Sequence, residues 1–207
     1  MTDLTAFQQL SPTTLADVLT RANVMDIGIR PLWSGMPRVA GIAYPVRCAI
    51  GDNLMLHAAI YRAPPGSIIV VEAGDVDYAV AGGNVCAVAQ KNGIAAFVID
   101  GVIRDLAEVR DNRFPVFARG VSPIPGGKDI LDKINAPVTC GGVLVSPGDV
   151  VIADEEGIVV VPLDKLDAVL QAAQARAAKD AAETLESWEA AHRARIDDIL
   201  RKKGFTD

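Results

Sequence analysis

Two runs of consecutive apolar and β-branched residues constrain the fold of this chain more than any other feature. Residues 67–72 read Ser-Ile-Ile-Val-Val-Glu, and residues 94–100 form a second apolar run. A strand that lacks polar alternation is buried on both faces, which is typical of parallel strands covered by helices. Residues 84–92 lie between the two runs and have a helical pattern that Gly93 ends. The sequence therefore predicts a βαβ unit and a partly parallel sheet.

Further elements are predicted on both sides of this unit. Residues 11–22 begin with Ser11 and Pro12, which favour a helix start. Residues 138–162 contain apolar runs separated by turn sequences, a pattern that indicates an antiparallel β meander. The predicted fold class is therefore α/β, with a mixed sheet or a second β layer.

The best candidate domain boundary lies near Pro162. Residues 1–162 form the predicted α/β core domain, and residues 163–207 form a charged, Ala-rich helical extension. A lone solvated helix rarely contains residues such as Trp188 and Ile196, so we expect the extension to make contacts between subunits. The alternative is a charged helix that frays in solvent.

Composition narrows the class of protein. The net charge of −6 argues against a nucleic-acid partner, which requires a basic face, although local arginines can still attract an anionic substrate. Cys48, Cys86 and Cys140 are odd in number and widely spaced, which favours buried free thiols in a reducing compartment. Residues 1–9 lack a signal-peptide pattern, and no apolar run could span a bilayer, so we expect a soluble cytoplasmic protein without a membrane partner.

A charged cluster follows the second buried strand and is the main candidate site. Arg104 has a planar guanidinium that can hold a carboxylate through two hydrogen bonds. Asp105 offers a hard oxygen ligand of the kind that Mg²⁺ or Mn²⁺ prefers, and Asp100 lies close by in sequence. The alternative is a structural ion pair between Arg104 and either aspartate.

A second candidate is the segment Gly82-Gly83-Asn84-Val85, directly before the predicted helix. A glycine pair at a helix N-terminus exposes backbone amides that can bind an anion, although such a pair is more often only a turn. We interpret His57 as an ordinary residue of a short helix and residues 126–129 as a surface turn.

These segments and several others resemble the RraA-like family over roughly residues 11–175. The glycine segment is followed at a fixed distance by DGVIRD, which is the most specific part of the resemblance. The matching segments are Gly82 to Val85, Gly93, and residues 25–32, 98–105, 114–120, 142–149 and 154–162.

The resemblance implies an α/β/β sandwich of the swivelling-domain type that assembles as a homotrimer or homohexamer with sites between subunits. It implies a lyase that cleaves 4-hydroxy-2-oxo diacids or decarboxylates oxaloacetate. Asp105 would then ligate a divalent metal, most simply Mg²⁺, with Mn²⁺ as the alternative. Arg104 would bind the substrate's carboxylate or oxo group, and Gly82, Gly83, Asn84 and Val85 would hold the substrate through backbone amides. We assign Asp100 part of the proton-transfer role, or the role of holding Arg104.

Two departures from the family pattern bear on the substrate. Some family aldolases carry an acidic residue at the position of Gly83, and their C-terminal tail lends a Glu to the neighbouring site, for which Glu183 and Glu186 are candidates here. The family also includes a non-catalytic inhibitor of ribonuclease E, which is the rival prediction. We discount a methyltransferase, because no glycine-rich nucleotide loop follows a first strand.

Overall fold

A computed structural model describes residues 4–205, so residues 1–3 and 206–207 at the ends of the two predicted domains lie outside it. The chain divides into two compact units, the first ending at Ala173 and the second beginning at Gln174.

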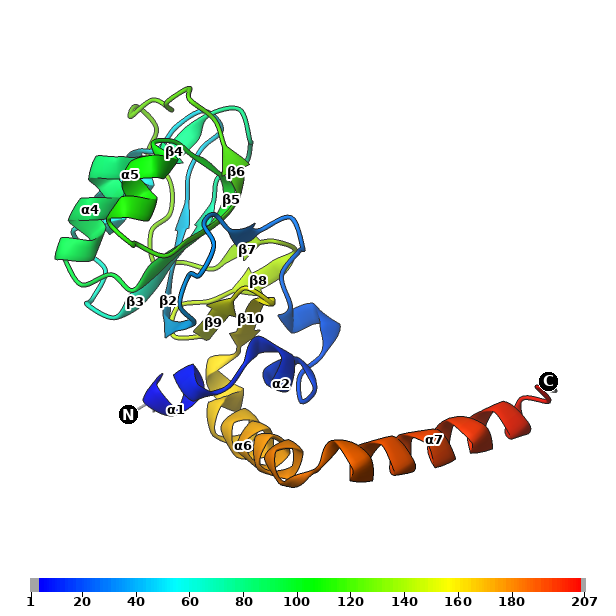
Figure 1. The fold of residues 1–207 in the computed structure, drawn as a ribbon. Helices are drawn as coiled ribbons and strands as arrows, with labels where there is room; N and C mark the ends of the chain where they lie inside the picture. The colour runs from blue at the N-terminus through cyan, green and yellow to red at the C-terminus, as the bar shows by residue number, and fades with distance from the viewer. Residues whose placement is uncertain (1–3, 206–207) are drawn as a thin grey trace. The chain divides into compact units, whose positions relative to one another are not determined.

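The first unit is built on an eight-stranded mixed sheet (Figure 1) with the order β1–β6–β5–β3–β2–β9–β10, in which β4 also pairs with β5. The pairs β2–β3, β3–β5, β4–β5 and β5–β6 are parallel, and the pairs involving β1, β9 and β10 are antiparallel. The strands are β1 (Arg30–Pro31), β2 (Val39–Arg47), β3 (Ser67–Glu72), β4 (Ala79–Ala81), β5 (Ala96–Ile103), β6 (Val116–Val121), β9 (Val150–Asp154) and β10 (Gly157–Val161).

Two buried cores lie on opposite faces of this sheet, because successive strand residues point in opposite directions. Ile69 and Val71 of β3 belong to the core under the helices, and Ile68 and Val70 belong to the core under a separate hairpin. The resulting layers, helices on one face and strands on the other, confirm the predicted α/β/β class. The helices of this unit are α1 (Leu4–Gln9), α2 (Pro12–Ala16), α3 (Leu54–Ala59), α4 (Gly83–Lys91) and α5 (Leu106–Asp111), and short 3-10 turns cover Arg21–Asn23 and Leu163–Lys165.

The helix predicted over residues 11–22 is shorter than expected, because α2 ends at Ala16. The following segment is hydrogen-bonded to β10. The Asn23 side chain donates to the carbonyl of Val160 at 3.2 Å, and the Met25 amide donates to the carbonyl of Ile158 at 3.0 Å. The end of the predicted helix is instead a 3-10 turn at Arg21–Asn23, and the residues that follow it bond to the sheet.

The predicted meander is divided between two sheets. β7 (Val138–Cys140) and β8 (Val143–Val145) form their own hairpin, turned by Gly141 and Gly142 at φ values of 55° and 75°. β9 and β10 pair in the main sheet instead. The two consecutive glycines permit the left-handed turn that separates β7 from β8.

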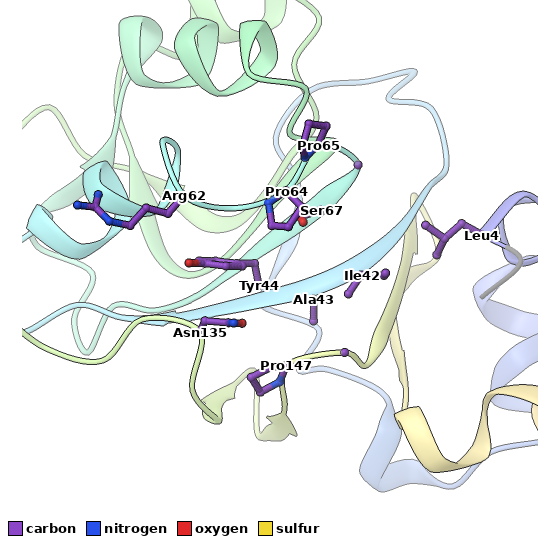
Figure 2. Close-up of a pocket in the computed structure, with 12 residues that line it drawn as sticks. Leu4, Ile42, Ala43, Tyr44, Arg62, Pro64, Pro65, Ser67, Asn135 and Pro147 are labelled. Atoms are coloured by element: carbon purple, nitrogen blue, oxygen red, sulfur yellow. The ribbon is translucent and has the colours of Figure 1, made fainter. Parts of the chain in front are cut away.

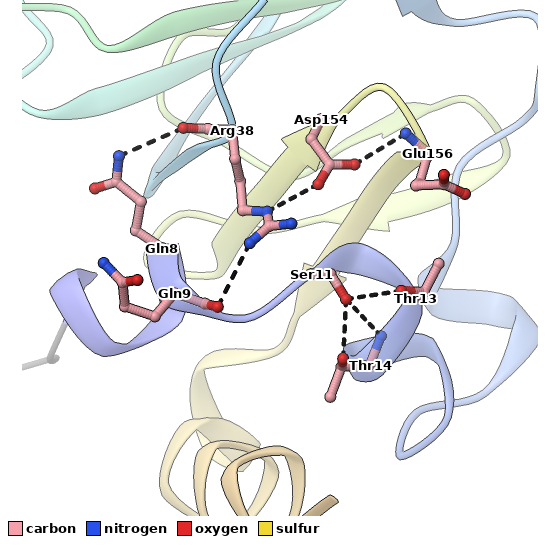
Figure 3. A network of polar contacts seen from close by, with 8 residues as sticks. All are labelled: Gln8, Gln9, Ser11, Thr13, Thr14, Arg38, Asp154 and Glu156. Carbon is pink, nitrogen blue, oxygen red and sulfur yellow. Dashed lines mark hydrogen bonds and ion pairs between the residues drawn. The ribbon is translucent and has the colours of Figure 1, made fainter. Parts of the chain in front are cut away.

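A polar network ties the N-terminal helices to the sheet (Figure 3). The Arg38 guanidinium donates to Asp154 at 2.8 Å and to the Gln9 carbonyl, and Asp154 also accepts from the Glu156 amide at 2.9 Å. Ser11 accepts from the Thr14 amide and caps α2, as its sequence position predicts.

The remaining helices are α6 (Leu166–Ala182) and α7 (Leu185–Lys202). The buried residues of α6, Leu166, Val169 and Ala173, all belong to the first unit. α7 begins with a capping box in which Thr184 accepts from the Ser187 amide, and it contains no buried residue. None of the helices within residues 4–205 has the length and hydropathy required to cross a membrane.

Candidate active site

The site is built at the carboxyl ends of parallel strands, where open α/β sheets bind ligands. The apolar run at residues 94–100 predicts a strand that ends at Asp100, but β5 continues through Gly101 to Ile103. Arg104 and Asp105 are therefore the first two residues beyond the strand. The Arg104 amide donates to the Ala81 carbonyl at 2.9 Å, which fixes the chain beside the end of β4.

Asp105 adopts a left-handed backbone conformation, with φ 58° and ψ 39°, and stands at the N-cap of α5. This conformation is uncommon for a residue with a Cβ atom and is concentrated at functional sites. It turns the carboxylate back toward the start of α4, where Oδ2 accepts from the Gly83 amide at 3.1 Å. The Arg104 Nε lies 3.4 Å from the same oxygen.

The glycine pair is required by this close approach. A Cβ atom at Gly82 would lie 2.5 Å from Asp105 Oδ2 and 3.1 Å from Arg104 Cγ. The two sequence motifs singled out as candidates are therefore parts of one site, and the predicted ion pair between Arg104 and Asp105 is present within it.

A further carboxylate, which the sequence analysis missed, covers the second glycine. A Cβ atom at Gly83 would lie 2.9 Å from Glu108 Cδ, so the Glu108 side chain fills the space that a side chain at position 83 would need. Glu108 is three residues after Asp105 at the start of α5, and this spacing places both side chains on one helical face. That spacing is the sequence signal that could have identified it.

A small pocket of about 80 Å³ opens in front of these groups. Besides Gly82, Asn84, Val85, Arg104 and Asp105, its lining includes Ala79 and Ala81 of β4. Two distant segments complete it, one with Asn53 and His57 and the other with Pro125 and Lys128. Arg104 and Lys128 outnumber the one lining carboxylate, and the N-terminus of α4 adds a positive dipole end. The pocket is therefore suited to a small anion in a chain whose overall charge is negative.

Lys128 is positioned by Asp52, a buried residue at the start of α3. The Asp52 carboxylate accepts from the Asp129 amide at 2.6 Å and the Ile130 amide at 3.2 Å. Burial opposes ionisation of Asp52, but these backbone hydrogen bonds outweigh it and lower the pKa of the carboxyl group. The segment interpreted as a surface turn is thus held against the pocket.

His57 and Asn53 form the α3 side of the pocket, although sequence analysis gave His57 no role. Burial, and next the charge of Lys128, lower the pKa of His57, so the imidazole is neutral at physiological pH. The Asn53 amide nitrogen donates to the Gly126 carbonyl at 3.2 Å, while its Oδ1 is buried without a hydrogen-bond partner in the described part of the chain. An unsatisfied buried acceptor is uncommon and is typical of a ligand-binding or water-binding site.

The structure separates Asp100 from the other predicted site residues. Asp100 pairs with Arg119, and its Oδ2 accepts from the Gly141 amide at 2.8 Å. It lines a different pocket that includes Glu72 and Thr139. Because side chains alternate along β5, Asp100 shares the face of Val98 and points toward the β7–β8 hairpin.

Asp105 is the hard oxygen ligand that the lining of this pocket offers to a divalent metal. No group of three or more His, Cys, Asp or Glu side chains suited to a metal occurs within residues 4–205. Mg²⁺ often binds through one or two carboxylates and completes its shell with water and substrate oxygens. Asp105 fits that pattern, because only its Oδ2 is hydrogen-bonded within the described residues and Oδ1 is left for a ligand.

A larger cavity of about 390 Å³ lies elsewhere, at the amino end of β3 (Figure 2). Its wall includes Ile42, Tyr44, Pro64 and Pro65, and Arg62 is the charged residue among those that line it. No carboxylate for a hard metal is among its lining residues, so the smaller pocket is the better candidate site despite its size.

The three cysteines are free and buried, which confirms the predicted thiols. Burial raises the pKa of Cys86, on α4 behind the glycine pair, to about 12. The thiols are therefore protonated and are not nucleophiles at neutral pH.

Comparison with known proteins assigns this arrangement to a family. The model of the RraA-like family, described as Aldolase/RraA, matches residues 12–160. The chain belongs to the RraA-like family.

Three relatives illustrate what the chain is similar to. A Halalkalibacterium halodurans protein named "Putative 4-hydroxy-4-methyl-2-oxoglutarate aldolase" is 36% identical over 205 residues, covering 99% of this chain and 93% of the relative. A structure from Pseudomonas syringae, described as an uncharacterized protein, superposes with a TM-score of 0.77 at 30% identity, covering 91% of this chain and 92% of that one. The RNA-processing inhibitor RraA from a Thermus species has a TM-score of 0.67 at 25% identity, covering 73% and 92%.

Proposed function

We propose that this protein is a divalent-metal-dependent carbon–carbon lyase of small 2-oxo acids. Its reactions are retro-aldol cleavage of 4-hydroxy-2-oxo diacids to pyruvate, decarboxylation of oxaloacetate, or both. The observation that carries the proposal is the convergence of Arg104, Asp105 and the α4 amides on one pocket, which Lys128 also lines. The similarity to proteins named as aldolases supports the same reaction class.

Asp105 would hold the metal through its carboxylate, and Mg²⁺ or Mn²⁺ suits a single hard oxygen ligand. When bound, the metal supplies Lewis-acid polarisation of the substrate's oxo group. The hydrogen bond from Gly83 and the nearby Arg104 hold the Asp105 carboxylate in place before any ligand arrives.

Arg104 and the α4 amides bind the reacting end of the substrate. Both reactions generate negative charge on the former oxo oxygen, and a fixed guanidinium stabilises that charge more than the neutral ground state. The backbone amides of Gly82, Asn84 and Val85 supply further donors for the adjacent carboxylate, while the Gly83 amide holds Asp105.

Lys128 and His57 bind the distal end of a diacid in this proposal. Lys128 adds the second positive charge that a second carboxylate requires, and the neutral His57 offers a hydrogen bond without a competing charge. A monocarboxylate would leave Lys128 without its counter-charge, so diacids are the preferred class.

Glu108 is assigned the role of positioning the proton acceptor, because its carboxylate is beside Gly83 at the edge of the site. The proton of the 4-hydroxyl group must leave during retro-aldol cleavage. A water molecule oriented by the Glu108 carboxylate can accept this proton. Asp100, to which we first gave this role, pairs with Arg119 at another pocket and is assigned a structural role instead.

A homo-oligomer with sites between subunits completes the proposal, as a trimer or hexamer in the cytoplasm. The Arg104 and Asp105 side chains remain 43% and 37% exposed, and a neighbouring subunit would exclude the water that still reaches them.

The test is an assay of oxaloacetate decarboxylation and of 4-hydroxy-4-methyl-2-oxoglutarate cleavage, with Mg²⁺ and with EDTA. Arg104→Ala and Asp105→Ala should each lower kcat/KM by about 10²-fold or more. Arg110→Ala, which changes a charge on the same α5 helix away from the lining residues, is the matched control. Undiminished turnover in EDTA, or in both site variants, would refute the mechanism.

The rival function is ribonuclease regulation by surface binding, which the similarity to a Thermus RNA-processing inhibitor supports. Such a protein needs no metal. Stoichiometric capture of a ribonuclease, together with no lyase activity towards either substrate, would favour this alternative.

A further inference from the structure

α7 presents a stripe of exposed apolar side chains. Leu185, Trp188 and Ile196 are 75%, 48% and 38% exposed, and no residue of α7 is buried. Burial of such side chains is a main source of association free energy. The helix is nevertheless well formed, because its capping box satisfies the amides of the first turn.

The stripe has the spacing of a helix–helix seam. Leu185, Trp188, His192, Ile196 and Ile199 are separated by three, four, four and three residues, so they lie on one face. The Trp188 and His192 rings stack with centroids 4.5 Å apart, which makes the centre of this face flat. A flat apolar seam favours a second helix as its partner.

The charges of the segment have opposite signs at its two ends. Residues 183–189 contain Glu183, Glu186 and Glu189 and no basic residue, whereas residues 193–203 contain five basic and two acidic residues. This order suits the dipole of α7 itself, but the dipole does not account for the apolar stripe. Two copies side by side in parallel would place like charges together, and two antiparallel copies would place opposite charges together.

A groove at the turn between α6 and α7 is complementary to the C-terminal end of α7. It has a volume of about 440 Å³, and Leu185 and Trp188 are its apolar lining. Its charged lining consists of Arg176 and Asp180, which pair with each other at 2.9 Å, and Glu183, which supplies the net negative charge. The C-terminal end of α7 combines the apolar Ile199 and Leu200 with a basic run at residues 201–203, which keeps a net positive charge although Arg201 and Lys202 pair with Asp198. The groove and the helix end are complementary in both hydrophobicity and charge.

We propose that α7 helices of two copies of this chain pair in antiparallel orientation, with the C-terminal end of each seated in the α6–α7 groove of the other. A two-fold axis passes near His192, and Leu185 of one copy lies near Ile199 of its partner. This surface joins copies independently of the lyase pocket and of the proposed reaction.

Cross-linking tests both the pairing and its direction. Cys48, Cys86 and Cys140 are at most 3% exposed, so the native full-length chain is a suitable background for introduced thiols. Leu185→Cys and Ile199→Cys chains carrying different tags are co-expressed and treated with a short bis-maleimide. We expect mixed cross-linked dimers at about fivefold or more over those from Leu185→Cys alone. Ala194→Cys, on the opposite face of α7, is the control and should give none.

Each alternative has its own result. Equal cross-linking in Leu185→Cys alone would overturn the antiparallel direction, and no cross-linking in the mixture would overturn the pairing. If the mixture does not cross-link but Trp188→Ala lowers the mass measured by light scattering, the stripe docks on another part of a partner subunit, which also overturns the proposal.

A charge exchange provides an independent measurement. Glu183→Lys and Lys203→Glu should each weaken association, measured by sedimentation, and mixing the two variants should restore part of it. Because both side chains are exposed, these changes leave folding intact, which circular dichroism would verify. Equal weakening in the mixture and in the single variants would overturn the complementarity.

Discussion

The Asp105 carboxylate accepts a hydrogen bond from the Gly83 amide at 3.1 Å, and this contact joins the end of β5 to the start of α4. The residues are 22 positions apart in sequence, yet the contact between them requires a particular backbone conformation at each. Asp105 needs its left-handed backbone to reach the amide, and the turn needs glycine so that the carboxylate can approach. The site is therefore held by local backbone geometry before any ligand binds.

Replacing Gly82 by alanine should disable the site while the fold survives. The new Cβ would lie 2.5 Å from Asp105 Oδ2 and would push the carboxylate away from the Gly83 amide. We expect kcat/KM to fall by about 10²-fold, as displacements near 1 Å can do. Gly120→Ala is the control, since a Cβ there meets nothing within 4 Å. Steady-state kinetics and thermal melts of both variants would measure this, and equal activity in the two would contradict the prediction.

Replacing Arg104 by lysine should not preserve activity. Lysine keeps the charge but loses the planar fork that can bind two substrate oxygens. We expect kcat to fall by about 10²-fold or more, because the charge that it stabilises develops during the reaction. Arg110→Lys on α5 is the control. The comparison requires kcat and KM separately, and a change in KM alone would assign Arg104 to ground-state binding.

The two motifs at the centre of this site were predictable from local sequence, but the residues that distant segments add to its lining were not. The buried run at residues 67–72, the glycine pair and the Arg104–Asp105 step are local signals, and each appears in the structure where the sequence predicts it. Lys128 lies in the same pocket as Asn53 and His57 because Asp52, next to α3, binds the amides of the distant loop at residues 129–130. Such tertiary hydrogen bonds have no periodicity in sequence, so His57 was interpreted as an ordinary helix residue.

The pKa of His57 should make the folded state less stable in acid. Burial and then Lys128 lower this pKa below its usual value near 6.5, so the unfolded chain binds a proton more readily than the folded one. This contribution to stability is complete above pH of about 6.5 and is lost as pH falls toward the folded-state pKa. Denaturant melts at pH values from about 6.5 down to the folded-state pKa measure the free energy of unfolding. This free energy should depend less on pH for His57→Asn than for the parent chain. An unchanged dependence would show that His57 does not carry it.

Removing Lys128 should raise the pKa of His57. The charge of Lys128 is the second cause of the lowered pKa, after burial, so Lys128→Met should move the His57 titration upward without restoring the ordinary value. Nuclear magnetic resonance of the imidazole protons would follow the shift, and a His192→Gln background leaves His57 as the only histidine. A downward shift, or none, would mean that Lys128 does not face His57.

Asp100 and Asp105 should respond in opposite ways to the same isosteric change. Asp100→Asn replaces a carboxylate that pairs with Arg119 and accepts from the Gly141 amide, so it should cost about 1–3 kcal/mol of unfolding free energy. Its activity per folded molecule should remain, because Asp100 does not line the pocket of Arg104. Asp105→Asn keeps an oxygen acceptor for Gly83 but removes the charge that a metal requires, so activity should fall while stability changes little. Urea denaturation and metal-dependent kinetics of both variants measure the difference. If the Asp100→Asn variant folds fully but loses activity, Asp100 has a catalytic role and the reacting centre lies nearer to β7.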